Sequence, residues 1–134
     1  VSREDGSGTR GAFIELFGIE TKNDDGSKTD NTVSTAEISN STSVVLTTVA
    51  GNPSAIGYVS LGSLNDTVKA LKIDGVEATV ANVENGTYKI QRPFVFVTND
   101  SAPLSEQAQA FFDFATSTDA ADLIRTAGAV PVNE

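Results

Sequence analysis

Apolar blocks alternate with polar stretches along this chain, and the spacing within each block predicts its structure. A helix is predicted at residues 11–17, directly after a loop of Gly, Ser and Thr. A second helix is predicted at residues 44–50, because Ser and Thr side chains before it can cap it and Gly51-Asn52-Pro53 ends it. Residues 18–31 are rich in Asn, Asp, Gly, Ser and Lys, and they predict a solvated loop.

The middle of the chain predicts strands. Residues 55–61 are dense in apolar side chains, as in a short buried strand. Residues 68–73 alternate between apolar and polar side chains before a turn at Asp74-Gly75. Residues 88–98 give the strongest strand pattern of the chain, although Pro93 interrupts it.

Further helices are predicted in the C-terminal part. A short one spans residues 79–84, a longer one begins near Ser105, and a last one spans about residues 119–126 and ends at Gly128. The apolar face of the longer helix is expected to pack in the core, since these residues follow helical spacing: Leu104, Ala108, Phe111, Phe112 and Ala115. The element order predicts an α/β fold.

The loop before the first helix carries the most specific chemistry in the chain. It contains Arg3-Glu4-Asp5-Gly6-Ser7-Gly8-Thr9-Arg10. A helix N-terminus offers unpaired N–H groups and partial positive charge, Gly lets the backbone approach an anion closely, and Ser, Thr and Arg donate further hydrogen bonds. This pattern favours a tetrahedral anion. A simple helix cap is the alternative reading of Ser7-Gly8-Thr9.

Composition limits the possible partners. The net charge is -9 and the nine Lys and Arg residues are spread along the chain, which disfavours nucleic acid. The charge is compatible with an anion site because short-range donors dominate over distant, salt-screened surface charge. The chain has no Cys, so it has no thiolate metal site, and no His, the most common general base. We expect no cofactor.

Three classes of enzyme fit the motif poorly. A P-loop needs Gly-x-x-x-x-Gly-Lys-Ser/Thr, whereas the stretch from Gly6 to Thr9 is too short and lacks the Lys. A serine hydrolase needs a base beside Ser7, usually His. A metal-dependent phosphatase would draw on Asp24, Asp25 and Asp30, which lack EF-hand spacing. We expect no enzyme, and the alternative to anion binding is a non-catalytic interaction domain in which the Ser-Gly-Thr loop only caps a helix.

Four blocks of the chain resemble the phosphate-binding proteins that serve phosphate ABC transporters. They are residues 3–13, which hold the anion motif, and residues 55–61, 88–94 and 111–132, in the order of that family. The first block is quite specific and the others are supportive, and together they cover most of the chain. The resemblance implies a periplasmic-binding-protein-like α/β fold of type II, with a mixed sheet flanked by helices, here truncated.

The resemblance also implies how a phosphate ion would be held. Arg3 would make charged hydrogen bonds, while Ser7 and Thr9 would supply hydroxyl and backbone N–H groups. Gly8 would supply a backbone N–H, and Asp5 would pair with Arg3 to hold its guanidinium. The family often has a basic residue at the position that Arg10 occupies in this chain. The implied phosphate ligands are Arg3, Asp5, Ser7, Gly8, Thr9 and Arg10.

A two-lobed organisation is implied as well. Residues 1–88 would form the second lobe with the anion motif, and residues 89–134 would return with two helices to the other, incomplete lobe. The chain would then be the C-terminal half of the receptor, and its missing N-terminal half would carry the remaining phosphate contacts. The implied partners are inorganic phosphate, that missing half and the membrane permease of the importer. The implied location is bacterial, either lipid-anchored on the extracellular face of the membrane or periplasmic.

Overall fold

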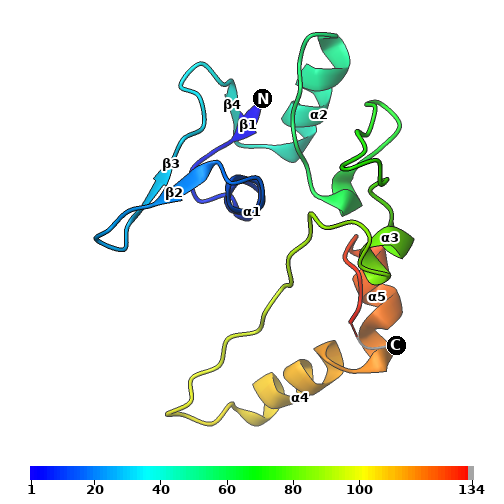
Figure 1. Cartoon of the computed structure of the whole chain (residues 1–134). Helices are drawn as coiled ribbons and strands as arrows, with labels where there is room; N and C mark the ends of the chain where they lie inside the picture. Colours follow the sequence, from blue (N-terminus) through cyan, green and yellow to red (C-terminus); the bar gives the residue numbers. More distant parts are fainter. Residues whose placement is uncertain (133–134) are drawn as a thin grey trace. The chain divides into compact units, whose positions relative to one another are not determined.

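The structure, a computed structural model, describes residues 1–132. The chain divides into two compact units, Val1–Gln91 and Arg92–Glu134 (Figure 1). Every helix in the described part of the chain is too short or too polar to span a lipid bilayer.

Short two-stranded sheets lie in the N-terminal part of the first unit (Figure 1). Strand β1 (Ser2–Arg3) pairs in parallel with β4 (Ile38–Ser39). Strands β2 (Glu20–Lys22) and β3 (Lys28–Asp30) form an antiparallel hairpin inside the stretch predicted to be a loop. The loop prediction was wrong because backbone pairing, the ion pair between Glu20 and Lys28 and polar side-chain hydrogen bonds together hold this polar hairpin. The hairpin is largely exposed, so it carries no apolar alternation that would reveal it.

Three predicted helices are confirmed in the first unit. They are α1 (Gly8–Leu16), α2 (Thr42–Gly51) and α3 (Val80–Glu84). The first two begin two or three residues earlier than predicted, because the Ser and Thr residues before the apolar run extend the helix. Val45 of α2 is 1% exposed and forms the centre of the small core.

The segment at residues 55–61 does not form the predicted strand, and its Gly57 lies against α2. Its last residue begins the short 3-10 helix η1 (Leu61–Ser63). A Cβ atom added to Gly57 would lie 3.0 Å from Val45 Cγ1 and 3.1 Å from Val49 Cγ2. The strand prediction was wrong because a short apolar block looks the same whether it packs on a sheet or on a helix.

The turn predicted at Asp74-Gly75 is confirmed. Asp74 has a φ of 51° and Gly75 a φ of 81°, the left-handed values of a tight hairpin turn. Ile73 and Val76 exchange hydrogen bonds of 3.0 and 2.9 Å across it. The strand predicted before the turn is wrong, because pairing at residues 68–73 is limited to this bridge.

The two remaining predicted helices, which follow residue 104, are confirmed. Helix α4 (Glu106–Ala115) begins after Ser105, whose hydroxyl accepts a hydrogen bond from the backbone of the first turn. The 3-10 turn η2 (Thr118–Ala120) leads directly into α5 (Ala121–Thr126). Gly128 follows with a φ of 82°, as expected for a residue that ends a helix.

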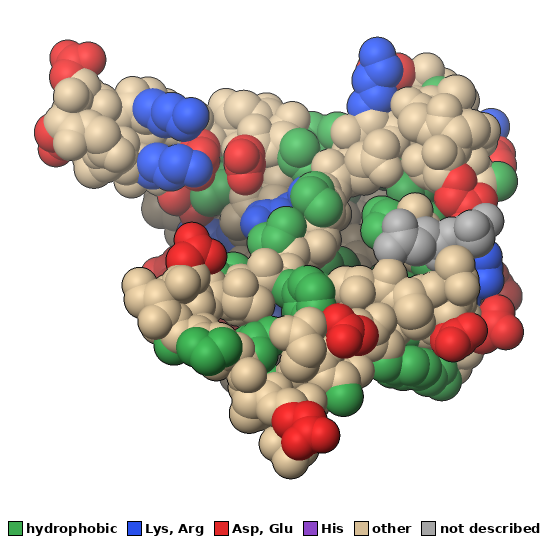
Figure 2. All heavy atoms as spheres, turned by 90° about the horizontal axis from the view of Figure 1, so that it is seen from below, with side chains coloured by type: hydrophobic (Ala, Val, Ile, Leu, Met, Phe, Trp, Pro, Cys, Tyr) green, Lys and Arg blue, Asp and Glu red, His purple; other side chains and the backbone are tan. Residues whose placement is uncertain are grey.

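The stretch before α4 differs most from prediction. Residues 89–98 form no regular structure, and Phe94 and Val97 are 94% and 90% exposed. A strand is stabilised only beside another strand, and the described residues of this unit contain none. Phe111 of α4 is 64% exposed, so the expected core packing of this helix face was also wrong. Figure 2 shows hydrophobic side chains reaching the surface of the molecule.

Candidate anion-binding site

The loop between β1 and α1 presents the first N–H groups of the helix. Gly6 has a φ of +83°, a conformation that glycine adopts without strain. Ser7 is the N-cap, and its Oγ accepts a hydrogen bond of 3.3 Å from the N–H of Arg10. The N–H groups of Gly8 and Thr9 cannot find a partner inside the helix. A Cβ added to Gly8 would meet no atom within 4 Å, so the backbone there is open to approach.

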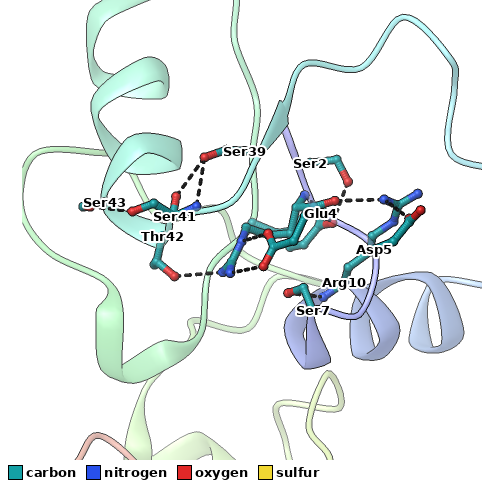
Figure 3. A network of polar contacts seen from close by, with 11 residues as sticks. Ser2, Glu4, Asp5, Ser7, Arg10, Ser39, Ser41, Thr42 and Ser43 are labelled. Carbon is teal, nitrogen blue, oxygen red and sulfur yellow. Dashed lines mark hydrogen bonds and ion pairs between the residues drawn. The ribbon is translucent and has the colours of Figure 1, made fainter.

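Arg3 is held at all three nitrogen atoms of its guanidinium. Its partners Glu4 and Thr42 are labelled in Figure 3. Its Nε donates to Glu4 Oε2 at 2.9 Å and its Nη2 to Glu4 Oε1 at 3.0 Å, which makes a forked ion pair. Its Nη1 donates to Thr42 Oγ1 at 2.9 Å. The expected pairing of Arg3 with Asp5 was therefore wrong. Glu4 takes this place, because Asp5 lies further along the turn and pairs with Arg10 instead.

Arg10 ties the loop to neighbouring elements. Its Nε donates to Asp30 Oδ2 of β3 at 2.9 Å, and its Nη2 lies 2.8 Å from the same oxygen. Its Nη1 donates to the carbonyl oxygen of Arg3 at 2.9 Å and lies 2.8 Å from Asp5 Oδ1. Most of its N–H groups are thus committed to protein partners. In this structure Arg10 joins α1, β1 and β3 while keeping its charge beside the loop.

The six predicted ligand residues run from the end of β1 to the first turn of α1, but some of their donors are occupied. The N–H of Ser7 donates to the carbonyl oxygen of Glu4 at 3.2 Å. The expectation that the Ser7 N–H faces an anion was therefore wrong. Its hydroxyl group accepts one hydrogen bond as a cap and keeps its own O–H free to donate elsewhere. Ser7 can thus cap α1 and donate to an anion at the same time.

Tyr58 anchors the start of the loop, and sequence reasoning missed it. Its hydroxyl accepts from the N–H of Arg3 at 3.1 Å and lies 2.6 Å from Ser2 Oγ. Its ring stacks on Phe13 of α1, with centroids 4.1 Å apart. A Tyr in an apolar block was a usable signal, because its hydroxyl usually finds a polar partner when it is covered. No signal in the sequence pointed to Glu4 or Thr42.

The ion pairs shift the pKa values of the charged groups. The hydrogen bond from Arg3 holds the pKa of Glu4 below its ordinary value, and the same bond raises the pKa of Arg3. The hydroxyl and N–H of Thr32 lower the pKa of Asp30, with Arg10 adding to the effect. These groups are all charged at neutral pH, so the loop is a fixed array of charges and hydrogen-bond donors.

This array can hold an oxyanion. Amide and hydroxyl donors stand at the start of α1, and the side chain of Arg3, five residues before Gly8, is 14% exposed. A depression of about 320 Å³ beside the loop includes Glu4, Arg10 and Val33 in its walls. Within residues 1–132, no three His, Cys, Asp or Glu side chains gather closely enough to hold a metal ion.

Comparison with known proteins identifies the family. Residues 1–119 match the family model described as a PBP superfamily domain. The chain is similar to phosphate-binding protein PstS 2 of Streptococcus agalactiae serotype V, with 55% identity over 133 residues, which are 99% of this chain and 45% of the relative. It is also similar to phosphate-binding protein PstS of Bacillus subtilis, with 33% identity over 138 residues, covering 100% of this chain and 41% of the relative.

Solved structures agree with this match. A phosphate-binding protein of a phosphate ABC transporter from Streptococcus pneumoniae gives a TM-score of 0.82 at 51% identity, over 92% of this chain and 47% of that one. An ABC-type phosphate transport receptor from Vibrio cholerae gives 0.81 at 33% identity, over 96% of this chain and 50% of that one. The chain thus spans half or less of the length of these proteins, and their folds confirm the predicted fold class. It belongs to the PBP superfamily.

Proposed function

We propose that this chain is part of an extracytoplasmic solute-binding protein that captures inorganic phosphate for an ABC importer. The relatives from Streptococcus and Bacillus are named phosphate-binding proteins, and the Vibrio neighbour is a phosphate transport receptor. The observation that carries the proposal is the open N-terminus of α1, where the N–H groups of Gly8 and Thr9 have no partner inside the helix and the backbone at Gly8 is open to approach. Such a receptor binds and releases its solute unchanged, so it is not an enzyme.

Each proposed ligand contributes in its own way. The amides of Gly8 and Thr9 and the hydroxyl groups of Ser7 and Thr9 would donate to phosphate oxygens, supported by the dipole of α1. Arg3 would add a forked, charge-assisted contact. Asp5 and Arg10, which form an ion pair with each other, would act as fixed charges that shape the loop. The proposed site comprises Arg3, Asp5, Ser7, Gly8, Thr9 and Arg10.

The alternative is an interaction domain in which the loop only caps α1. Ser7 does cap the helix, but this contact uses a lone pair of its oxygen and leaves its O–H free. Capping therefore does not compete with anion binding. The similarity to named phosphate-binding proteins over nearly the whole chain favours the receptor.

We further propose that residues 1–88 belong to the second lobe of the receptor and residues 89–134 to the other, incomplete lobe. The boundary between the compact units, at Gln91 and Arg92, supports this division. The chain would be the C-terminal half, and its partners would be the N-terminal half and the membrane permease. The receptor would be bacterial, working in the periplasm or lipid-anchored on the outer face of the membrane.

Calorimetric titration of phosphate into a two-lobed receptor that contains this chain tests the site. Arg3→Ala should weaken binding by about 2 to 5 kcal/mol, roughly 30-fold to several thousand-fold, because it removes a charge-assisted forked contact. Arg92→Ala is the matched control, since Arg92 is exposed and lies in the other compact unit. Unchanged affinity in Arg3→Ala would overturn the assignment.

A glycine substitution separates binding from capping. Gly8→Val should block the anion while α1 stays folded, because a side chain there points into open space. Gly51→Val is the control, since Gly51 ends α2 and its added Cβ would also meet no atom within 4 Å. If Gly8→Val binds phosphate like the unmodified receptor, with normal circular dichroism, the loop only caps the helix.

A further inference from the structure

The backbone of Arg3 is fixed before its side chain reaches the site. Its N–H donates to the hydroxyl of Tyr58 at 3.1 Å, and its carbonyl oxygen accepts from Arg10 Nη1 at 2.9 Å. Its position in β1 pairs it with Ser39 of β4. The Cα of Arg3 is therefore held in place. The direction of its guanidinium then depends on the hydrogen bonds that the guanidinium itself makes.

The guanidinium of Arg3 donates hydrogen bonds to two residues, Glu4 and Thr42. A guanidinium carries five N–H donors. Glu4 accepts from Nε and Nη2, and Thr42 accepts from Nη1. Within the described residues, these contacts leave one N–H on Nη1 and one on Nη2. Each of these two N–H groups can donate a charge-assisted hydrogen bond to an oxyanion.

We propose that Thr42, together with Glu4, positions the guanidinium of Arg3 for phosphate and thereby sets the phosphate affinity of the site. This inference rests on the proposed function. A free Arg side chain loses much rotamer freedom when it binds an anion, and contacts that hold it beforehand remove that loss from the binding step. Thr42 Oγ1 is one of those contacts, and it comes from the first residue of α2.

Thr42 allows a cleaner test than Glu4. Its hydroxyl is neutral, so its removal leaves the charges at the site unchanged, whereas changing Glu4 also removes a carboxylate near the anion. Thr42 is not the N-cap of α2, which is Ser41, so a substitution leaves the cap position intact. Val has nearly the same shape as Thr and lacks the acceptor oxygen.

Phosphate titration of a two-lobed receptor containing this chain gives the main readout. Thr42→Val should weaken phosphate binding about three- to tenfold, because Arg3 is no longer held for the anion. Thr42→Ser should restore most of the affinity, since it keeps the hydroxyl. Thr47→Val is the matched control, because the Thr47 hydroxyl donates to Ser43 O within the same helix, on its exposed side. Its phosphate affinity should equal that of the unmodified receptor.

A double substitution separates positioning from a general loss of structure. In an Arg3→Ala receptor, Thr42→Val should have no further effect on phosphate affinity. If Thr42→Val binds normally, or weakens binding equally with and without Arg3, the positioning role is overturned while the site stands. If Arg3→Ala itself leaves affinity unchanged, the proposed function fails and this inference fails with it.

Discussion

The loop that precedes α1 and the segment that precedes α4 both end in a Ser that caps a helix, yet they differ in how many contacts hold them to the rest of the molecule. Ser7 caps one helix and Ser105 the other, each accepting from an N–H of the first turn. The first loop is fixed by ion pairs, and both of its Arg side chains are about 15% exposed. In the second segment, the four residues 94–97 are 55% to 94% exposed.

The difference lies in contacts from distant parts of the chain. The first loop receives partners from Asp30, Thr42 and Tyr58, far along the sequence. The second has apolar side chains and a β-type pattern, but no strand within its described unit to pair with. A local signal is enough to begin a helix, whereas an irregular segment or a strand becomes ordered only when its partners are present.

The largest expected effect concerns phosphate affinity. The isolated 134-residue chain should bind phosphate at roughly millimolar strength or weaker, far below a two-lobed receptor. The proposed other wall of the site is absent, and losing about half of the charge-assisted contacts removes roughly 1.5 to 3 kcal/mol for each one. Parallel titrations of both proteins give the comparison, with circular dichroism to show that the helices of the chain are formed. Micromolar binding by the chain alone would contradict it.

Stability measurements should separate the two regions. Val45→Ala should lower the free energy of unfolding by about 2 kcal/mol, because it removes buried methyl groups from the centre of the core. Val97→Ala is the matched control, since Val97 is 90% exposed and should change stability by less than about 0.5 kcal/mol. Equal effects in urea unfolding of the two variants would mean that the exposed segment is packed after all.

Self-association gives a smaller effect. The exposed run of residues 94–97 should bring copies of the isolated chain together at high concentration, because contiguous apolar surface favours burial. Phe94→Ser should weaken this association about tenfold, which corresponds to about 1.4 kcal/mol. Sedimentation velocity over a concentration series measures it, with Val33→Ser, an exposed apolar residue of the other unit, as control. A monomeric chain at all concentrations would exclude this prediction.

The smallest expected effect is the pH dependence conferred by Asp30. Its pKa is lowered in the folded state, so its contribution is present above the unfolded value near 4 and is lost as the pH falls through the folded pKa. Asp30→Asn should therefore lower stability by about 0.5 kcal/mol at pH 7, and the difference should vanish in acid. Thermal unfolding from pH 3 to 7 measures this, with exposed Asp66→Asn as control. A difference that grows in acid would have the wrong sign.

The helices of this chain could be predicted because their signals are local. Ser7, Thr79 and Ser105 each stand directly before a helix and cap it. Gly128 follows the last helix with a positive φ. The strands could not be predicted. The polar hairpin of β2 and β3 is held by backbone pairing and polar side-chain contacts and has no apolar alternation, and the apolar pattern of residues 88–98 has no partner strand among the described residues after Gln91.

The proposed site was only partly predictable for a similar reason. The turn of Gly and Ser before α1 follows from the sequence, because a helix N-terminus needs such residues. The partners of the arginines do not follow from it. Arg3 pairs with Glu4 while Asp5 pairs with Arg10, and Thr42 belongs to a helix about forty residues away. The spacing of residues along the sequence therefore does not predict these contacts.

Gly57 shows what this packing means for mutational tolerance. Its surface is exposed, so a ranking of positions by solvent exposure would place it among the sites that accept any residue. A Cβ atom added to Gly57 would point toward α2 and lie within 3.1 Å of two Val methyl groups, so even Ala would require these methyl groups to shift by a few tenths of an ångström. Neighbouring Ile56 is 67% exposed and should accept many residues. In a library of variants, adjacent positions of similar exposure would therefore differ in the substitutions they tolerate. The direction in which a side chain leaves the backbone, and not the solvent exposure of the residue, limits the size of the side chain that fits.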